Sequence, residues 1–269
     1  MTIFLASVSR VWLRLYNSIL VHGLTGTLYR LFRYPVRLVG QTRLRRRIFK
    51  STDVASVFSE IYETNWWGSA DSVSGTGSTL SSTANLRATL PSIFNTIGAK
   101  KIFDAPCGDF NWMRHVIQSG DIDYIGGDIV SQLIDNNTEM YQAERTRFVL
   151  TNIIEDDFPK VDLWICRDCL IHFSFDDILA TFENFARSEI DYILTTTHIN
   201  RSGFRNMNIR TGDARMIDLF SEPFLLPKSY LISVDDWRAP EPPKIMVLFS
   251  RKQIIESLPG MRASLGRSR

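Results

Sequence analysis

From residue 98 onward, short apolar runs alternate with amphipathic stretches, and this alternation restricts the fold more than any other feature of the sequence. The apolar runs predict strands at 101–105, 124–129, 147–150, 161–166, 192–197 and 245–250, and the stretches between them predict helices at 110–118, 131–142 and 175–186. Strands that alternate with helices form a mostly parallel sheet with helices on both faces. Crossovers between parallel strands are right-handed, so the C-terminal ends of the strands share one edge, where ligands bind. The sequence therefore predicts an α/β, Rossmann-like, doubly wound fold.

Two further helices are expected before this region, at 53–66 and 83–97, with Gly98 as the C-terminal cap of the second. Between them, residues 69–82 are rich in Ser and Gly and include the run Ser-Gly-Thr-Gly-Ser at 74–78. Such a segment is either a flexible linker or a lid or ligand-binding loop. Both interpretations stay open at this point.

Residues 1–52 form a basic leader with ten Arg or Lys side chains and no Asp or Glu, whereas the rest of the chain is net acidic. Apolar side chains recur at helical spacing within 3–21, which predicts an amphipathic helix. Such a leader could give peripheral contact with an anionic membrane surface through residues 1–50. The alternatives are a helical appendage packed on the body and a mitochondrial-type leader. Nucleic acid is not an expected partner, because the acidic body would repel it.

The composition, with 44% hydrophobic and 22% charged residues, is that of a soluble globular protein with a sizeable core. Three cysteines are an odd number and give no disulfide framework, which fits a reducing compartment. No uninterrupted apolar run approaches the ~20 residues of a membrane span, and Arg10 and Arg14 interrupt the first apolar stretch. We expect a cytoplasmic location, with peripheral contact at the inner face of a membrane through the leader. The expected organisation is the leader at 1–52, one folded domain at 53–255 and a flexible basic tail at 256–269.

The loop from Asp104 to Phe110 carries the first chemical signal. An apolar strand ends in Asp104, turns through Gly108 and opens a helix. Backbone N–H groups at a helix start can receive a carboxylate, and a glycine lets the ligand approach closely. Asp104 stands where it could bind an ammonium group, directly or through water. Any doubly wound fold has a turn of this kind, so the loop alone indicates only a ligand-binding strand end.

A second acidic residue, Asp128, closes the next strand after Gly126-Gly127. An acidic side chain at this place can hydrogen-bond both ribose hydroxyls of a nucleotide, nicotinamide or adenosyl. The dinucleotide fingerprint Gly-x-Gly-x-x-Gly is missing, because Pro106, Gly108 and Asn111 occupy its three positions. A pyrophosphate would be poorly accommodated there, which argues against hydride transfer and for an adenosyl ligand.

The segments 104–108, 127–128, 152–153 and 162–172, in this order and spacing, resemble the motifs of class I S-adenosylmethionine-dependent methyltransferases. More narrowly, the chain resembles a bacterial branch in which Trp-Gly and Ser-Gly-x-Gly-Ser stretches precede an Asp-x-Pro-Cys-Gly cofactor loop. The resemblance covers roughly residues 55–252 and leaves the leader outside. It implies a seven-stranded, mostly parallel sheet and S-adenosyl-L-methionine as the cofactor.

The resemblance also implies roles for individual residues. Asp104 and the loop after it would hold the methionine end of the cofactor, Asp128 the ribose, and Asn152 the adenine amino group, with Ile153 on the ring. The implied cofactor-binding residues are Asp104, Ala105, Pro106, Cys107, Gly108, Asp109, Phe110, Trp112, Asp128, Ile129, Asn152, Ile153 and Arg167. Pro106 and Phe110 replace two of the family's glycines, and Asn152 replaces its Asp. Because an Asn oxygen still accepts from an amino group, we expect weaker rather than absent binding.

Asp168 and His172 are the candidate catalytic residues, at the mouth of the fourth predicted strand. Methyl transfer to an alcohol needs a group that removes the hydroxyl proton, and histidine has a suitable pKa. A spacing of four residues places both on one side of a helical turn, where the carboxylate could orient the ring. The alternative is that His172 caps the following helix and Asp168 bonds only to the backbone.

Cysteines also lie near this site, and a zinc centre of Cys107, Cys166, Cys169 and His172 is conceivable. The geometry of the strands argues against their convergence, and the sequence has no second Cys-x-x-Cys. We therefore expect no metal.

A long polar insertion at 195–227 follows the fifth predicted strand. Its Asn, Asp and Arg side chains would suit a sugar-like acceptor; alternatively, it is a solvated loop packed by its own apolar residues. We expect methyl transfer to a hydroxyl or similar nucleophile of a small molecule or glycan. The alternatives are a Rossmann-type nucleotide-dependent oxidoreductase and a non-catalytic methyltransferase-like adaptor at a membrane surface.

Overall fold

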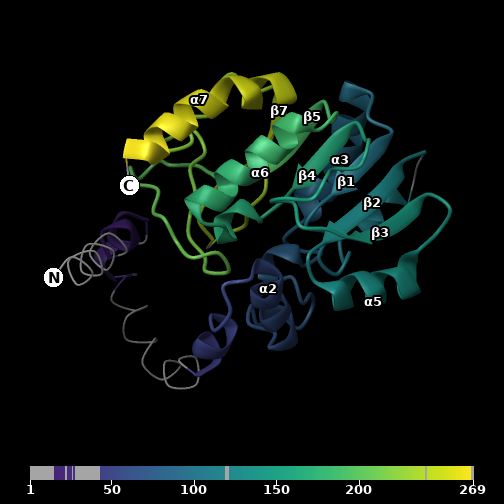
Figure 1. Cartoon of the computed structure of the whole chain (residues 1–269), viewed down its shortest axis with the longest axis horizontal. Helices are drawn as coiled ribbons and strands as arrows, with labels where there is room; N and C mark the ends of the chain where they lie inside the picture. Colours follow the sequence, from purple (N-terminus) through teal and green to yellow (C-terminus); the bar gives the residue numbers. More distant parts are fainter. Residues whose placement is uncertain are drawn as a thin grey trace.

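The computed structural model describes residues 15–21, 23–25, 27, 43–118, 121–239 and 241–267. Within this part of the chain, a seven-stranded sheet lies between layers of helices (Figure 1). The strands are β1 (Lys101–Asp104), β2 (Asp123–Asp128), β3 (Thr146–Leu150), β4 (Leu163–Cys166), β5 (Tyr192–His198), β6 (Ile232–Asp235) and β7 (Lys244–Ser250). The helices are α2 (Val54–Glu63), α3 (Ala84–Ile97), α4 (Arg114–Ile117), α5 (Ser131–Tyr141), α6 (Phe175–Arg187) and α7 (Arg251–Arg267), with 3-10 turns η1 (Thr76–Ser78) and η2 (Leu170–His172).

The strand order is β3-β2-β1-β4-β5-β7-β6. Strands β1 to β5 pair in parallel, and β7 runs antiparallel to both of its neighbours. From β1 the chain adds β2 and β3 on one side, then returns to add β4 and β5 on the other. The winding direction therefore switches between β1 and β4, the place where ligands bind in open α/β sheets. This confirms the expected Rossmann-like, doubly wound, mostly parallel sheet.

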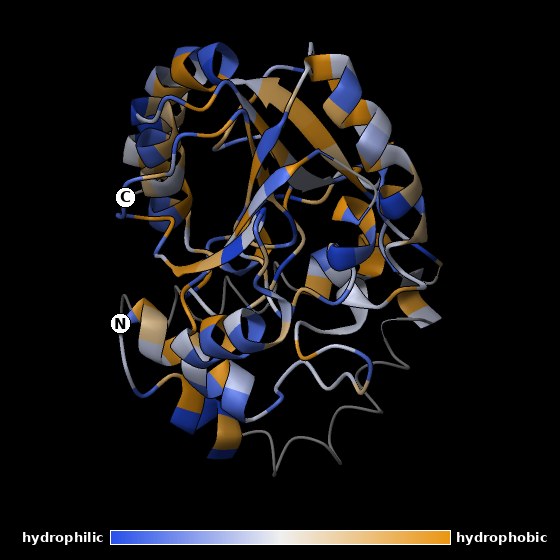
Figure 2. Ribbon diagram, turned by 90° about the vertical axis from the view of Figure 1, so that its right-hand side faces the viewer, coloured by the Kyte–Doolittle hydropathy of each residue, from blue (hydrophilic) through white to orange (hydrophobic). Residues whose placement is uncertain are grey.

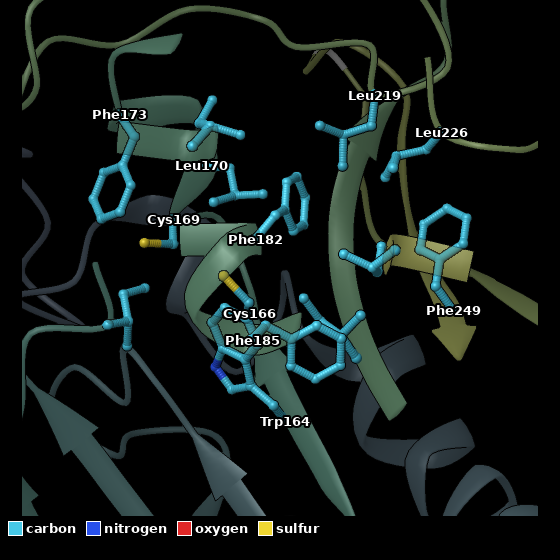
Figure 3. Packing of buried hydrophobic residues seen from close by; sticks show 14 of the residues in the cluster. Trp164, Cys166, Cys169, Leu170, Phe173, Phe182, Phe185, Leu219, Leu226 and Phe249 are labelled. Carbon is cyan, nitrogen blue, oxygen red and sulfur yellow. The ribbon is translucent and has the colours of Figure 1, made fainter. Parts of the chain in front are cut away.

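The sheet is buried on both faces, as near-continuous apolar strands require. In β4, Leu163 and Ile165 belong to the core cluster beside α3 and α4, whereas Trp164 and Cys166 belong to the cluster beside α6 and α7. Figure 3 shows the second cluster, in which the Trp164 and Phe185 ring centroids are 5.6 Å apart. Apolar colour follows the inner strands in Figure 2, while the helices mix polar and apolar residues. Side-chain alternation along the strands thus supplies both halves of the core.

Two elements differ from the expectation around the sheet. The helix expected at 110–118 is shorter, because the chain first turns at Phe110, whose φ is 55°, and α4 begins only at Arg114. The edge strand β6 was not predicted, and Val234 is its one buried residue. A short strand at a sheet edge buries few side chains, so its sequence shows only a weak alternation of apolar and polar residues.

The C-terminal segment is a helix, which corrects the flexible tail expected at 256–269. α7 extends to Arg267, where the described chain ends. Its buried residues are Ile254, Leu258, Met261, Ser264 and Leu265. They recur every three or four positions and pack α7 against α6. Pro259 and Gly260 are poor helix formers, but burial of this apolar stripe outweighs their local preference.

The described end of the basic leader, residues 43–50, docks on the folded body. Ile48 is buried with Val57 and Ile61 of α2, and Arg45 Nη2 lies 2.6 Å from Asp213 Oδ2. This part of the leader is therefore a packed appendage. Most of the amphipathic helix expected at 3–21 lies outside the described residues, of which 15–21 are helical. Among the described helices, none has the length and apolarity needed to cross a membrane.

The packing of α7 predicts different costs for two adjacent isoleucines. Ile254 is fully buried, whereas Ile255 is 43% exposed. Ile254→Ala should lower the free energy of unfolding by about 2–5 kcal/mol, and Ile255→Ala by no more than about 0.5 kcal/mol. Urea unfolding of both variants measures this difference. Equal stabilities would mean that the C-terminal segment does not pack on the core.

Candidate active site

A cavity of about 380 Å³ lies at the C-terminal ends of β1, β2, β4 and β5, where the winding direction switches. The cofactor loop and Asp128 line one part of it. The other part is lined by α2, by the Ser/Gly-rich segment 73–78, and by residues that follow β4 and β5. The sheet thus brings together the candidate residues that were predicted at its strand ends.

Asp104 is the last residue of β1 and lines the cavity. One of its carboxylate oxygens accepts a hydrogen bond from the protein. Tyr124 Oη donates to Asp104 Oδ2 at 2.7 Å. Burial raises the pKa of Asp104 to about 7, although Tyr124 and the Arg167 charge favour the ionised form. A cation that enters the cavity would stabilise the ionised form of this buried carboxylate, because it compensates the loss of hydration.

The loop after Asp104 wraps closely around Gly108. Gly108 has a φ of 55°, and a Cβ atom there would lie 2.1 Å from Ser74 Oγ. Its backbone N–H donates to Asp128 Oδ2 at 3.0 Å. The Cys107 N–H donates to the Gly127 carbonyl at 2.8 Å, which joins the loop to β2. Only glycine satisfies both the positive φ and the close approach of the Ser/Gly-rich segment.

Asp128, at the end of β2, connects two loops that border the cavity. Its Oδ2 accepts from Gly108, and its Oδ1 accepts from the Val130 N–H at 3.1 Å. Burial raises the pKa of Asp128 to about 6, against these backbone hydrogen bonds. Each carboxylate oxygen can accept a second hydrogen bond, so the side chain can still bind a pair of hydroxyls.

Two residues expected in the cofactor site do not border the cavity. Ala105 is buried in the cluster beside α6, and its carbonyl accepts from Trp164 Nε1 at 2.9 Å. Phe110 is buried among aromatic rings, 4.9 Å from Tyr124 and 5.1 Å from Phe148 between centroids. Both residues therefore shape the loop from behind. The other expected cofactor residues border the cavity: Asp104, Pro106, Cys107, Gly108, Asp109, Trp112, Asp128, Ile129, Asn152, Ile153 and Arg167.

Asn152 uses its side chain within its own turn. Its Oδ1 accepts from the Ile154 N–H at 3.1 Å, and its Nδ2 donates to Glu155 at 2.9 Å. An adenine amino group would have to share the Asn152 oxygen with Ile154. Ile153 borders the cavity and is buried, as a residue that packs on a ring would be.

The Ser/Gly-rich segment is anchored at both ends, which favours a lid or ligand-binding loop over a flexible linker. At one end, the Asp109 carboxylate accepts from Ser72 Oγ and from the Val73 N–H, each at 3.0 Å. At the other end, Arg167 Nη2 donates to the Gly77 carbonyl at 2.9 Å. Asp109 thus holds this segment over the cofactor loop, a contact that the sequence did not reveal because its partners are distant along the chain.

A cluster of four charged residues lies beside this segment. Arg167 is paired twice with Asp236, Nε to Oδ2 at 2.9 Å and Nη2 to Oδ1 at 2.8 Å. Lys244 Nζ donates to Asp168 Oδ2 and lies 3.6 Å from Asp236 Oδ2. Burial disfavours the charge on Asp168, but Lys244 and Arg167 hold its pKa well below the usual range. Sequence analysis missed Asp236, which follows the edge strand β6, and Lys244, the first residue of β7, since both lie late in the chain.

His172 lines the cavity, but its hydrogen bond is to the Asp213 carbonyl and not to Asp168. This corrects the expected pairing of Asp168 with His172. His172 ends the 3-10 turn η2 instead of lying one α-helical turn after Asp168. Its Nδ1 lies 2.9 Å from the Asp213 carbonyl, and its ring lies 5.1 Å from that of Trp67. Burial lowers the pKa of His172, although the Asp213 carbonyl and the Asp168 charge favour the protonated form.

Polar side chains of the insertion after β5 bond within the insertion and to residues 49–51. Asn206 Nδ2 donates to the carbonyls of Asp218 and Glu222, and Arg210 donates to the carbonyls of Phe49 and Ser51. Among its described residues, His198 is the one that lines the cavity. Apart from His198, the described residues of the insertion therefore do not line this cavity.

The cysteines Cys107, Cys166 and Cys169 are free thiols, and all three are buried. Burial raises the pKa of Cys107 and Cys169 well above the ordinary thiol value. Within the described ranges, no group of three or more His, Cys, Asp or Glu residues is arranged to hold a metal ion.

No protein-family model and no curated protein sequence matches this chain. Solved structures do match it. The chain is similar to magnesium protoporphyrin IX methyltransferase (ChlM) from Synechocystis PCC 6803 with bound SAH, with a TM-score of 0.53 and 16% identity over 74% of this chain and 98% of that chain. It is also similar to the mitomycin 7-O-methyltransferase MmcR, with a TM-score of 0.52 and 14% identity over 77% of this chain and 60% of that one.

At identities this low, the structural similarity shows a common fold and nothing finer. The chain therefore has the Rossmann-like fold of the S-adenosylmethionine (SAM)-dependent methyltransferases. The Synechocystis protein was solved with SAM as well as with SAH, the demethylated product S-adenosylhomocysteine.

The anchoring of the Ser/Gly-rich segment can be tested by hydrogen exchange. Asp109→Ala removes the acceptor of the Val73 N–H, so exchange of this amide should accelerate by about tenfold or more, since hydrogen bonds to charged groups contribute roughly 1.5–3 kcal/mol. Asp121→Ala, at a side chain that is 89% exposed, is the control and should leave Val73 unchanged. Unchanged exchange in Asp109→Ala would mean that the segment is held by other contacts.

Proposed function

We propose that this protein transfers a methyl group from SAM to a hydroxyl group of a small molecule. The observation that carries the proposal is that one cavity is lined by Asp104 and Asp128, at two strand ends, and by His172. The two carboxylates suit the ammonium and ribose ends of SAM, and the histidine suits removal of a hydroxyl proton.

The chain's own groups fit this cofactor better than a dinucleotide. At Gly108 a ligand can come close to the backbone, but the neighbouring loop positions are Pro106 and Asp109. A pyrophosphate would meet the Asp109 carboxylate here without the glycine-rich turn that binds it. The fit favours an adenosyl ligand with an amino-acid end and argues against the oxidoreductase alternative.

His172 has the proton arrangement that a general base requires. A carbonyl oxygen can only accept, so the contact with Asp213 places the ring proton on Nδ1 and leaves a lone pair on Nε2. The lowered pKa keeps the ring neutral near pH 7. SAM supplies an electrophilic methyl group on a sulfonium sulfur. His172 Nε2 would take the proton of the hydroxyl group that receives this methyl group.

Asp168 acts at a distance in this proposal. Its charge stabilises the imidazolium that forms on His172, because a nearby negative charge favours the protonated ring. Lys244 and Arg167 keep Asp168 ionised for this role.

The acceptor side of the cavity favours a small molecule with an apolar or aromatic part. Its walls include Phe58, Tyr62, Trp67, Ile171 and Phe173. A glycan is the less favoured acceptor, since His198 is the one described residue of the polar insertion that lines the cavity. A cytoplasmic enzyme fits the buried free thiols. Peripheral membrane contact would have to come from the part of residues 1–50 that precedes the docked segment. The adaptor alternative predicts cofactor binding without turnover.

Calorimetry with SAH and with NAD tests the cofactor proposal. SAH should bind and NAD should not. Asp104→Ala should abolish SAH binding, because it removes the partner of the ammonium group, and Asp128→Ala should weaken it by about 10- to 100-fold, equivalent to roughly 1.4–2.8 kcal/mol. Thermal unfolding of both variants controls for loss of the fold. Tight NAD binding with no SAH binding would overturn the proposal.

The pKa of Asp104 predicts how SAH affinity changes with pH. The ammonium group binds the ionised carboxylate, so affinity should fall as pH drops through about 7, where Asp104 takes up a proton. 5′-Methylthioadenosine has the adenosine but no ammonium group, so it controls for the titration of Asp128. An equal pH dependence for both ligands would exclude Asp104 as the ammonium partner.

Turnover of labelled SAM in a cell extract, followed by mass spectrometry of the methylated product, tests catalysis. His172→Ala should slow turnover by roughly 100-fold or more, as expected for a general base, while SAH affinity stays within about twofold. His115→Ala, at an exposed histidine, is the matched control and should have wild-type turnover. Full activity of His172→Ala would assign the proton transfer to another group.

A further inference from the structure

One short segment contacts both histidines that line the cavity. The Asp213 carbonyl lies 2.9 Å from His172 Nδ1, and the Ile217 N–H lies 3.2 Å from His198 Nδ1. His172 belongs to η2, and His198 is the last residue of β5. The segment 213–217 therefore contacts Nδ1 of both rings. It contacts His172 through a carbonyl and His198 through an N–H.

These contacts require opposite proton positions on the two rings. His172 Nδ1 must donate to the Asp213 carbonyl, so its Nε2 has the lone pair. His198 Nδ1 must accept from the Ile217 N–H, so the neutral ring carries its proton on Nε2. Burial lowers the pKa of both rings, that of His198 to about 4, and both are neutral near pH 7. The cavity thus has one ring that accepts a proton and one that donates a hydrogen bond.

His198 has Asp168 as a neighbour. The Asp168 N–H donates to Thr196 Oγ1 at 2.9 Å. Thr196 and His198 are two residues apart in β5 and project from the same face. Asp168 has a φ of 50°, a left-handed conformation that few non-glycine residues adopt, although Asp does so more often than most. The surrounding structure therefore holds Asp168 beside His198 against its backbone preference.

The Asp168 carboxylate is only half satisfied. Lys244 donates to Oδ2, and Arg167 Nη1 lies 3.5 Å from the same oxygen. In the part of the chain that the structure describes, nothing donates to Asp168 Oδ1, although this atom is buried. Buried carboxylate oxygens normally have a partner. Asp168 and His198 both line the cavity, and the Asp168 side chain is 21% exposed, so a bound molecule can reach this carboxylate at its exposed part.

We propose that Asp168 and His198 form a subsite for a second hydroxyl group of the acceptor, one that is not methylated. This hydroxyl accepts from His198 Nε2–H and donates to the Asp168 carboxylate. The inference rests on the proposed function, because the methylated hydroxyl is the one at His172. The acceptor is accordingly a compound with at least two hydroxyl groups on an apolar or aromatic body.

Other polar groups fit this subsite less well. A carboxylate or phosphate would face the ionised Asp168, and the two nearby cations, Lys244 and Arg167, are already paired with Asp168 and Asp236. An ammonium group could donate to Asp168, but it has no lone pair for His198 Nε2–H. A hydroxyl both donates and accepts through one oxygen.

Imidazole nitrogen NMR of the full chain tests the proton positions without any substrate. The four histidines are assigned by substituting each in turn. Near pH 7.5, His172 should be protonated at Nδ1 and His198 at Nε2, both with and without SAH. The same tautomer on both rings would overturn the proposal.

Catechol and phenol then test the ligand class, because they differ by one hydroxyl on the same ring. With SAH saturating, catechol should bind at least fivefold tighter than phenol and should shift the His198 signals. His198→Leu should make the two affinities equal, and His198→Gln, which keeps an N–H donor, should retain part of the preference. His115→Leu is the control and should keep the full preference.

Equal affinities of catechol and phenol for the wild-type protein, including the absence of binding by both, would contradict the assignment of the subsite. So would a preference that survives His198→Leu. Failure of SAH to bind would instead overturn the proposed function, and the nitrogen spectra would still test the arrangement of the two histidines.

Discussion

The buried ion pair between Arg167 and Asp236 is the interaction on which the rest of the site depends. Two hydrogen bonds of 2.9 and 2.8 Å join the side chains, which are 4% and 0% exposed. Arg167 follows β4 and Asp236 follows β6, so the pair joins the centre of the sheet to its edge. Removal of one partner from a buried pair typically costs about 3–5 kcal/mol. Arg167 also holds the Gly77 carbonyl, so the same group positions the segment that covers the cofactor loop.

The reversed direction of β7 makes the second half of this cluster possible. In an antiparallel strand, the first residue lies at the edge where the parallel strands end, and Lys244 pairs in register with His198. Lys244 therefore reaches Asp168 although the two residues are 76 positions apart in the sequence. Its charge keeps Asp168 ionised inside the protein, where a lone carboxylate would take up a proton.

Local sequence predicted well which residues line the cavity at the ends of β1 and β2. Asp104, Gly108 and Asp128 come together because each stands at a strand end or in the turn that follows it, and parallel strands share one edge. The same reasoning placed Phe110 at the cavity, which it does not line, and did not reveal that Asp109 also anchors the Ser/Gly-rich segment. In the fold, the Phe110 ring packs among Tyr124, Tyr141 and Phe148, and Asp109 binds the Ser/Gly-rich segment. Both contacts join residues that are distant in sequence, and no periodic pattern records them.

By itself, the sequence determined the alternation of strands and helices and the position of the acidic residues at strand ends, because both are properties of neighbouring residues. The tertiary structure decided the partners of the two cavity histidines. His172 meets Asp213 across 41 residues, and His198 meets Ile217 across 19. A carbonyl at one ring and an N–H at the other set where each proton lies, and hydrogen-bond direction at such a distance depends on how the chain packs.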